Sequence, residues 1–335
     1  MQTRRNEYDV TNQVKTTDSI AVSNEVCKIY QELYPDPNPD VLSQAFADLT
    51  RLYAGKYPGY MSCETSYHDI QHVLDVTLAM ARLMDGYEHA AHGTERFGER
   101  LFRLGIITAL FHDCGYIRHR NDTKHQNGAE YTLVHVSRGA SFLEEYLPKV
   151  GMPDLAGVAA QLVHFTGYEI PVQQIRVPSL VFRLLGNLLG SADIVAQMAD
   201  RCYLEKCHER LYPEFVLGGI ARRRKSDGSE EVVFESADDL VLKTPNFYRS
   251  ATKRMDETLG GAYRYVQRHF GGQNLYLEEM ERNVRFARII GENRDMSLLR
   301  RKLPVSNLGS APTRSDESER TQALHVATPE FMAPA

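Results

Sequence analysis

The chain has 335 residues, 42% of them hydrophobic and 25% charged, which is the composition of an ordinary globular protein with one large domain or two small ones. Acidic residues outnumber basic ones by 44 to 39, and the net charge of -5 argues against non-specific binding to nucleic acid. The five cysteines have neither disulfide nor zinc-knuckle spacing, and no signal peptide or apolar run of membrane-spanning length stands out, so we expect a cytoplasmic protein that does not enter a membrane.

Apolar residues recur with helical spacing along most of the chain. The expected helices, in chain order, cover residues 22–34, 41–54, 68–84, 100–111, 128–146, 155–165, 180–207, 247–269 and 275–290. Between 218 and 242 the pattern changes to that of a β-hairpin around the turn Asp227-Gly228. We therefore predict an all-α helical bundle with a small β-hairpin insertion, formed by a single domain over residues 25–302. A flexible segment, 1–24, precedes this domain, and a tail rich in Pro, Ser, Thr and Ala, 303–335, is expected to be disordered.

Two short motifs carry the chemistry of the sequence. His68 and His72 are four residues apart, so a helix through them would place both imidazoles on one face. His112 and Asp113 directly follow the apolar run 106–111. Burying an unpaired carboxylate costs several kcal/mol, so a cation is the natural partner of this pair. Asp113 could instead cap the next helix or pair with an arginine. Imidazole and carboxylate without thiolate are typical ligands of a hydrolytic divalent-metal site.

Three further polar residues stand within apolar stretches. His135 lies inside the predicted helix 128–146, His164 follows the apolar run 159–163, and Asp193 lies in an apolar helix with no cationic neighbour in sequence. Polar groups on separate apolar helices are hard to satisfy one by one. A shared cation site would satisfy all of them.

The order His72, His112-Asp113, Asp193 resembles the His…His-Asp…Asp pattern of the HD-domain metal-dependent phosphohydrolases. The string Tyr67-His68-Asp69-Ile70-Gln71-His72-Val73-Leu74-Asp75-Val76 is most similar to the Tyr-His-Asn-x-x-His-Ala-x-Asp-Val stretch of the class I cyclic-nucleotide phosphodiesterases. The resemblance implies an HD-domain helical bundle with two divalent metal ions (Mg, Mn, Zn or Fe). It also implies that His72, His112, Asp113 and Asp193 hold the first ion and that His68 is the general acid.

His135 and His164 resemble the extra histidines with which HD-GYP cyclic-dinucleotide phosphodiesterases hold a second metal. The HD-GYP signature itself and the His-Pro-Gly of the class I enzymes are absent from this sequence. The identity of the nucleotide, the metal and the oligomeric state, a homodimer included, therefore stay open.

The activity that the resemblance implies is hydrolysis of a 3′,5′-cyclic nucleotide (cAMP or cGMP) to the 5′-monophosphate. A hydroxide held between two metal ions that Asp113 bridges would attack phosphorus, and His68 would protonate the leaving oxygen. Arg118, Lys124 and His125 are candidates for contacts with this small anionic substrate. Asp75 either orients an imidazole of the site or is an exposed acid of the helix.

Three alternatives remain at this point. The chain could hydrolyse a cyclic dinucleotide or another nucleotide, or it could be a non-catalytic domain that senses a nucleotide. It could also be a di-iron oxygenase, because such enzymes use a similar set of histidines and aspartates.

Overall fold

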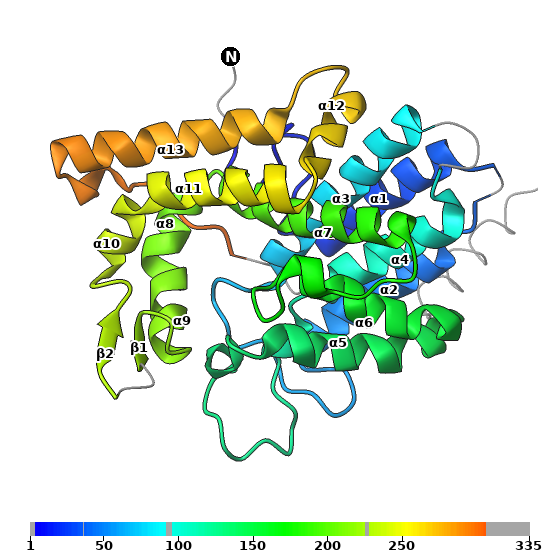
Figure 1. The fold of residues 1–335 in the computed structure, drawn as a ribbon, viewed down its shortest axis with the longest axis horizontal. Helices are drawn as coiled ribbons and strands as arrows, with labels where there is room; N and C mark the ends of the chain where they lie inside the picture. The colour runs from blue at the N-terminus through cyan, green and yellow to red at the C-terminus, as the bar shows by residue number, and fades with distance from the viewer. Residues whose placement is uncertain (1–3, 36, 92–95, 225–227, 306–335) are drawn as a thin grey trace, which may run out of the picture.

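The computed structural model describes residues 4–35, 37–91, 96–224 and 228–305, and this part of the chain is mostly α-helical (Figure 1). The α-helices are α1 (Ser19–Leu33), α2 (Asp40–Tyr53), α3 (Ile70–Ala90), α4 (Gly98–Leu110), α5 (His135–Tyr146), α6 (Ala156–Leu162), α7 (Leu180–Ala199), α8 (Tyr203–Lys206), α9 (Tyr212–Leu217), α10 (Ala237–Leu242), α11 (Thr244–Lys253), α12 (Val266–His269) and α13 (Leu275–Asn293). Strands β1 (Arg222–Arg224) and β2 (Glu230–Val232) form an antiparallel pair. The expectation of a mostly α-helical chain with a small hairpin is confirmed; residue 227 of the expected turn lies outside the described residues.

Helix α3 is the centre of the molecule. It packs against α1, α4, α7 and α12, and nearly all of its side chains are buried. A helix that is apolar on most of its circumference belongs in a core, because it has no polar face to present to water. Helices α11 and α13 lie side by side along one edge, and the hairpin lies with α9 and α10 at one end (Figure 1). The polar residues of α3 therefore need partners inside the protein.

Helix α7 is long and apolar enough to cross a membrane by length and composition, although the sequence alone predicts no membrane-spanning segment. It packs against α3 and α13, and its middle is buried in the core. Its apolar composition is explained by this packing, since a helix buried in a large core meets the same criteria.

The N-terminal segment differs from the flexible stretch expected up to residue 24. Helix α1 already begins at Ser19, where the Asp18 carboxylate accepts hydrogen bonds from the first backbone amides. Before it, Asp9 is buried and forms an ion pair of 2.5 Å with Arg82 of α3. Arg82 also donates to the hydroxyl of Tyr276 in α13. This long-range contact is invisible in the sequence, because the segment itself is polar.

Three predicted helices are divided in the structure: 128–146, 180–207 and 247–269, of which the last forms α11 up to Lys253 and α12 from Val266. The stretch 128–146 forms a 3₁₀ turn, Gly128–Tyr131, and then α5, which begins only at His135. The stretch 180–207 is interrupted at Asp200, which ends α7. The first break places His135 at the start of α5 rather than within a helix. Most of the tail expected to be disordered, 306–335, lies outside the described residues.

Candidate metal centre

The backbone after α4 brings the two parts of the site together. Helix α4 ends at Leu110, and His112 and Asp113 follow in the turn that leads into a short 3₁₀ helix, Cys114–Tyr116. A Cβ atom on Gly115 would lie only 1.8 Å from the carbonyl oxygen of His135. Because glycine has no side chain, the first turn of α5 packs directly against this turn. His135 is thereby placed beside Asp113.

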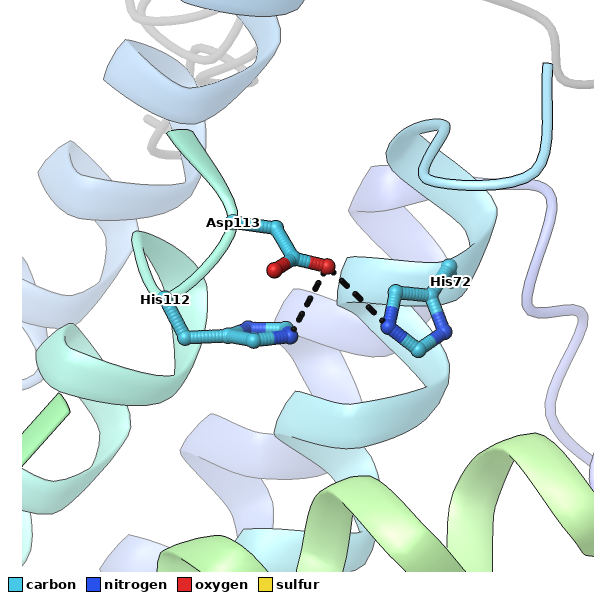
Figure 2. A group of neighbouring side chains, drawn as sticks. All are labelled: His72, His112 and Asp113. Atoms are coloured by element: carbon cyan, nitrogen blue, oxygen red, sulfur yellow. Dashed lines mark ion pairs between the residues drawn. The ribbon is translucent and has the colours of Figure 1, made fainter. Parts of the chain in front are cut away.

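One oxygen of Asp113 faces two imidazoles. Its Oδ2 atom lies 3.2 Å from Nε2 of His72, on α3, and 3.2 Å from Nε2 of His112 (Figure 2). From α7, Oδ1 of Asp193 lies 3.5 Å from the His72 nitrogen and 3.9 Å from the His112 nitrogen. His72, His112 and Asp113 are buried and offer ligand atoms within 4.8 Å of one another, so this group could hold a metal ion. The structure thus brings together the four residues expected at the first metal site.

The other oxygen of Asp113 faces a third imidazole. Nε2 of His135 lies 3.6 Å from Asp113 Oδ1. His135 stands at the first position of α5, whereas the sequence placed it within a helix. The Asp113 carboxylate therefore lies between His72 and His112 on one side and His135 on the other.

The hydrogen bonds at Nδ1, the ring nitrogen that does not face Asp113, indicate whether these histidines suit a metal. Nδ1 of His112 is 2.8 Å from the carbonyl oxygen of Ala109, and Nδ1 of His135 is 2.7 Å from that of Thr132. A carbonyl can only accept, so each Nδ1 carries a hydrogen, and in the neutral ring, which is the form that binds a metal, Nε2 has a lone pair. Nε2 of His112 is buried and has no hydrogen-bond partner among the described residues. A lone pair held beside a carboxylate oxygen suits a shared cation, and an imidazole anchored at its other nitrogen is the usual form of a metal ligand.

The pKa values of the metal-free site follow from the same geometry. Burial alone would lower the pKa of His72, but the hydrogen bonds that its ring donates to Asp113 and Asp193 outweigh burial and raise the pKa to about 10. In the same way, burial would raise the pKa of Asp113, but His112 and His72 hold it well below its usual range. Burial lowers the pKa of His135, and the Asp113 charge offsets this only in part. Without a cation, the site therefore keeps a proton between Asp113 and its imidazoles.

His68 lies outside helix α3, contrary to the expectation of one helix through both imidazoles. The helix begins at Ile70, and the carboxylate of Asp69 caps it by accepting from the His72 backbone amide. The His68 ring is nevertheless 5.7 Å from the His72 ring, centre to centre. His68 therefore reaches the site from the segment before the helix.

Glu214 of α9 is a site residue that the sequence did not predict. Its Oε2 atom is 2.6 Å from Nδ1 of His68, and its Oε1 atom accepts a hydrogen bond of 2.5 Å from the Tyr67 backbone amide. A carboxylate bound to Nδ1 fixes the ring and leaves Nε2 of His68 free. The only signal in the sequence is an acid directly before the apolar run 215–217, which is too weak to single out a partner of His68.

His164 and Asp75 have other neighbours than those expected. His164 is buried, its Nδ1 has no hydrogen-bond partner among the described residues, and its pKa is lowered by burial. The charged group acting on it is Glu169, which caps α5 and also acts on His135, while no described ion pair joins His164 to Asp113. His164 is thus near the start of α5 but not among the residues around Asp113.

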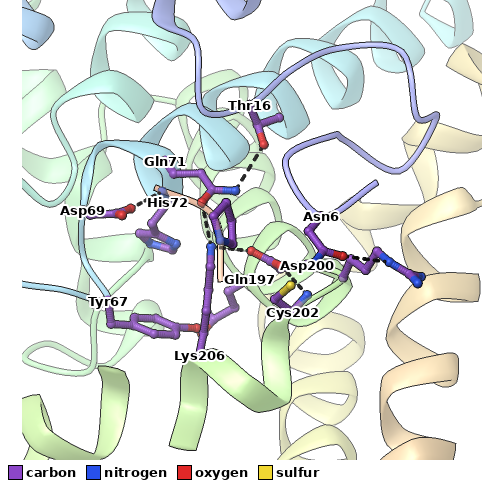
Figure 3. Close-up of polar contacts among 12 residues, drawn as sticks. Asn6, Thr16, Tyr67, Asp69, Gln71, His72, Gln197, Asp200, Cys202 and Lys206 are labelled. Carbon is purple, nitrogen blue, oxygen red and sulfur yellow. Dashed lines mark hydrogen bonds and ion pairs between the residues drawn. The ribbon is translucent and has the colours of Figure 1, made fainter. Parts of the chain in front are cut away.

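Asp75 lies in a buried polar cluster next to His72, and no described hydrogen bond joins it to an imidazole. Lys206 donates to Gln71 Oε1 at 3.1 Å and to Asp200 Oδ2 at 2.6 Å (Figure 3). Burial, followed by the charge of Asp200, raises the pKa of Asp75 to about 7. A small cavity beside this cluster is lined by Tyr67, His72, Asp75, Ala196, Gln197, Asp200 and Lys206.

The three residues expected to contact a substrate are engaged elsewhere or exposed. Arg118 forms an ion pair with Glu64, at 2.7 Å, and donates to the carbonyl oxygen of His125. The His125 ring is 3.2 Å from Asp122, and Lys124 is exposed. No described ion pair links any of the three to the residues around Asp113. Their nearness in sequence did not predict their partners, because the loop turns its polar groups onto itself.

No family model matches the chain, and neither a curated protein nor a solved structure matches it.

Proposed function

We propose that the protein is a metal-dependent phosphohydrolase of the HD-domain kind that cleaves a phosphodiester, with a 3′,5′-cyclic nucleotide as the favoured substrate. The observation that carries the proposal is the position of Asp113. One carboxylate contacts imidazoles through both of its oxygens, His72 and His112 through one and His135 through the other. A carboxylate placed in this way suits a centre of two cations.

The donor set supports hydrolysis. Imidazole and carboxylate ligands without thiolate suit Zn²⁺, Mn²⁺ or Fe²⁺, and a divalent ion bound there supplies a Lewis acid for the phosphate oxygens and lowers the pKa of a water molecule. His72, His112, Asp113 and Asp193 would hold one ion, and His135 with Asp113 would hold a second.

His68 has the position of a general acid. Its Nδ1 atom is bound to Glu214, and its Nε2 atom is free to give a proton to the leaving oxygen. Glu214 would hold the ring in place and stabilise its protonated form, as a carboxylate does for a catalytic histidine. Tyr67, which donates its amide to the same carboxylate, fixes the backbone on which His68 stands.

The test is a product screen combined with metal analysis. The protein is freed of metal with a chelator and reloaded with Zn²⁺, Mn²⁺, Fe²⁺ or Mg²⁺. It is then offered cyclic mononucleotides, cyclic dinucleotides, nucleoside monophosphates and small synthetic phosphodiesters. We expect the protein to hydrolyse a phosphodiester and Asp113→Ala to lose both this activity and the bound metal. Asp154→Ala, which removes an exposed acid, should keep both.

Three results would contradict the proposal. Absence of hydrolysis with every metal would remove the hydrolase assignment. Iron content with consumption of O₂ would replace it with an oxygenase. Tight nucleotide binding without product, unchanged by His68→Ala, would replace it with a sensor.

A further inference from the structure

We propose that Tyr116 is a positioning residue that holds the imidazoles of His68 and His135 in their working orientations with one aromatic ring. The inference rests on the proposed function for the roles of the two histidines. Tyr116 is neither a candidate metal ligand nor the candidate general acid, so the proposed function gives this tyrosine no role.

The evidence is a pair of stacked contacts. The ring centre of Tyr116 lies 4.3 Å from that of His68, with an angle of 18° between the planes. It lies 4.3 Å from that of His135 as well, with an angle of 19°. The two imidazoles are 6.4 Å apart and come from different segments, one before α3 and one at the start of α5. A single side chain therefore contacts the candidate general acid and the candidate ligand of a second ion.

Each imidazole needs this contact because its own torsion angle fixes it poorly. The outer torsion of a histidine side chain has broad minima, so a ring anchored by one hydrogen bond can still pivot about that bond. Among the described residues, the His68 ring hydrogen-bonds to Glu214 and the His135 ring to the carbonyl of Thr132, each through Nδ1. A flat ring pressed against each imidazole removes the remaining freedom.

The protein holds Tyr116 itself rigidly. The residue is buried, at 3% exposure, and ends the 3₁₀ helix Cys114–Tyr116 that begins directly after Asp113. Its backbone oxygen is so close to Gly128 that a Cβ there would lie 2.3 Å away. The tyrosine is thus tied to the same turn as the bridging carboxylate, which keeps the two histidines in register with Asp113.

The test compares Tyr116→Phe, which keeps the ring, with Tyr116→Leu and Tyr116→Met, which fill the space without one. Tyr146→Leu is the control, because Tyr146 is equally buried but its described ring contacts are with Phe111 and Phe142 rather than with an imidazole. The first readout is the NMR spectrum of the imidazole protons in the full chain, where the Tyr116 ring should give upfield shifts and NOEs to both histidines. The second is the affinity for Zn²⁺, measured by competition with a chelator.

We expect Leu and Met to abolish the upfield shifts and to weaken Zn²⁺ binding about 10–100-fold, as loss of a group that orients a ligand usually does. Tyr116→Phe should retain both the upfield shifts and the Zn²⁺ affinity, and Tyr146→Leu should change neither. If hydrolysis is established, Tyr116→Leu should lower kcat more than KM for esters with poor leaving groups.

Unchanged shifts and affinity in Leu and Met would overturn the proposal, and so would failure of Phe to restore them. If neither Leu nor Met folds, absence of NOEs from Tyr116 to the two imidazoles in the unaltered protein decides against it. A protein that shows the stacking NOEs but hydrolyses nothing refutes the proposed function and leaves the positioning role standing.

Discussion

At the scale of single residues, the site is organised by hydrogen bonds at the far side of each imidazole. His112 and His135 donate from Nδ1 to a carbonyl oxygen three residues earlier, and His68 donates to Glu214. In each case Nε2 is the atom left for chemistry. Because the three rings are held by different partners, the candidate general acid and the candidate metal ligands can be altered separately.

Replacing Glu214 with Gln should slow hydrolysis without removing metal. The amide oxygen can still accept from the His68 ring, but the Tyr67 amide loses its acceptor and the ring loses its neighbouring negative charge, so we expect a loss within the 10²–10⁴-fold range of general acid catalysis for esters of basic alcohols. Esters of p-nitrophenol should lose far less, because that leaving group needs no proton. Steady-state kinetics over a series of leaving groups checks this, with Glu209→Gln as an exposed control. An equal loss across the series would show that Glu214 does not act through proton transfer.

Metal binding should release protons and strengthen as the pH rises. The pKa of His72 is raised to about 10 in the metal-free site, so the ring is protonated at neutral pH and must give up its proton to a metal. Between pH 7 and 9 the affinity should therefore rise roughly tenfold per unit for each proton displaced. Calorimetry of Zn²⁺ binding in buffers of different ionisation enthalpy measures the release directly.

The stability of the metal-free protein depends on pH with the opposite sign to metal affinity. His72 has a higher pKa folded than the 6.5 of a free histidine, so its contribution to the stability of the metal-free protein is complete below pH 6.5 and is lost as the pH rises through about 10. Binding without proton release at pH 7 would contradict the assignment of His72 as a ligand.

At the scale of elements, the site depends on how closely the start of α5 approaches the turn after α4. Arg138 of α5 donates to the carbonyl oxygens of Gly115 and Ile117, at 2.7 and 3.0 Å. Glu169 accepts from the first backbone amides of the same helix. These contacts fix α5, and with it His135, against the turn that carries Asp113.

Gly115→Ala should separate α5 from that turn. The added methyl group would meet the His135 carbonyl, which is backbone and cannot rotate away. We expect a loss of about 1–3 kcal/mol in the free energy of unfolding, as for other overpacked sites, together with weaker metal binding. Gly157→Ala is the control, because nothing lies near a Cβ at that position of α6. Urea unfolding and Zn²⁺ titration of both variants decide the matter, and unaltered metal affinity in Gly115→Ala would refute the role of this contact.

At the scale of the whole molecule, segments far apart in sequence meet on α3. The N-terminal segment, through Asp9, and α13, through Tyr276, converge on Arg82. All three residues are nearly inaccessible to solvent. The helix that carries His72 is therefore held from both ends of the described chain.

Asp9→Ala should destabilise the protein by about 3–5 kcal/mol, because it leaves the buried Arg82 charge without its partner. The double variant Asp9→Ala/Arg82→Met should lose less than the sum of the single variants, since the unpaired charge is gone. The exposed pair of Arg100 and Asp154 offers the matched control, and Asp154→Ala should cost no more than about 1 kcal/mol. Equal costs for Asp9→Ala and Asp154→Ala in urea unfolding would mean that the N-terminal segment does not hold α3.

The sequence by itself determined the helical class and the residues that meet around Asp113. Both follow from local patterns: apolar spacing predicts a helix, and a histidine or aspartate within an apolar stretch must find a polar partner inside the protein. The apolar setting predicts His112, Asp113 and Asp193, the spacing from His68 and the family resemblance predict His72, and the sequence places His135 within a helix rather than at its start.

Only the tertiary structure decided which groups pair. Glu214 and Tyr116 reach the histidines across long stretches of chain, Asp75 faces Lys206 and Asp200 instead of an imidazole, and Arg118 is taken up by Glu64. Local spacing records whether a side chain is buried, but the choice of its partner depends on how distant segments pack, and no pattern within one helix carries that information.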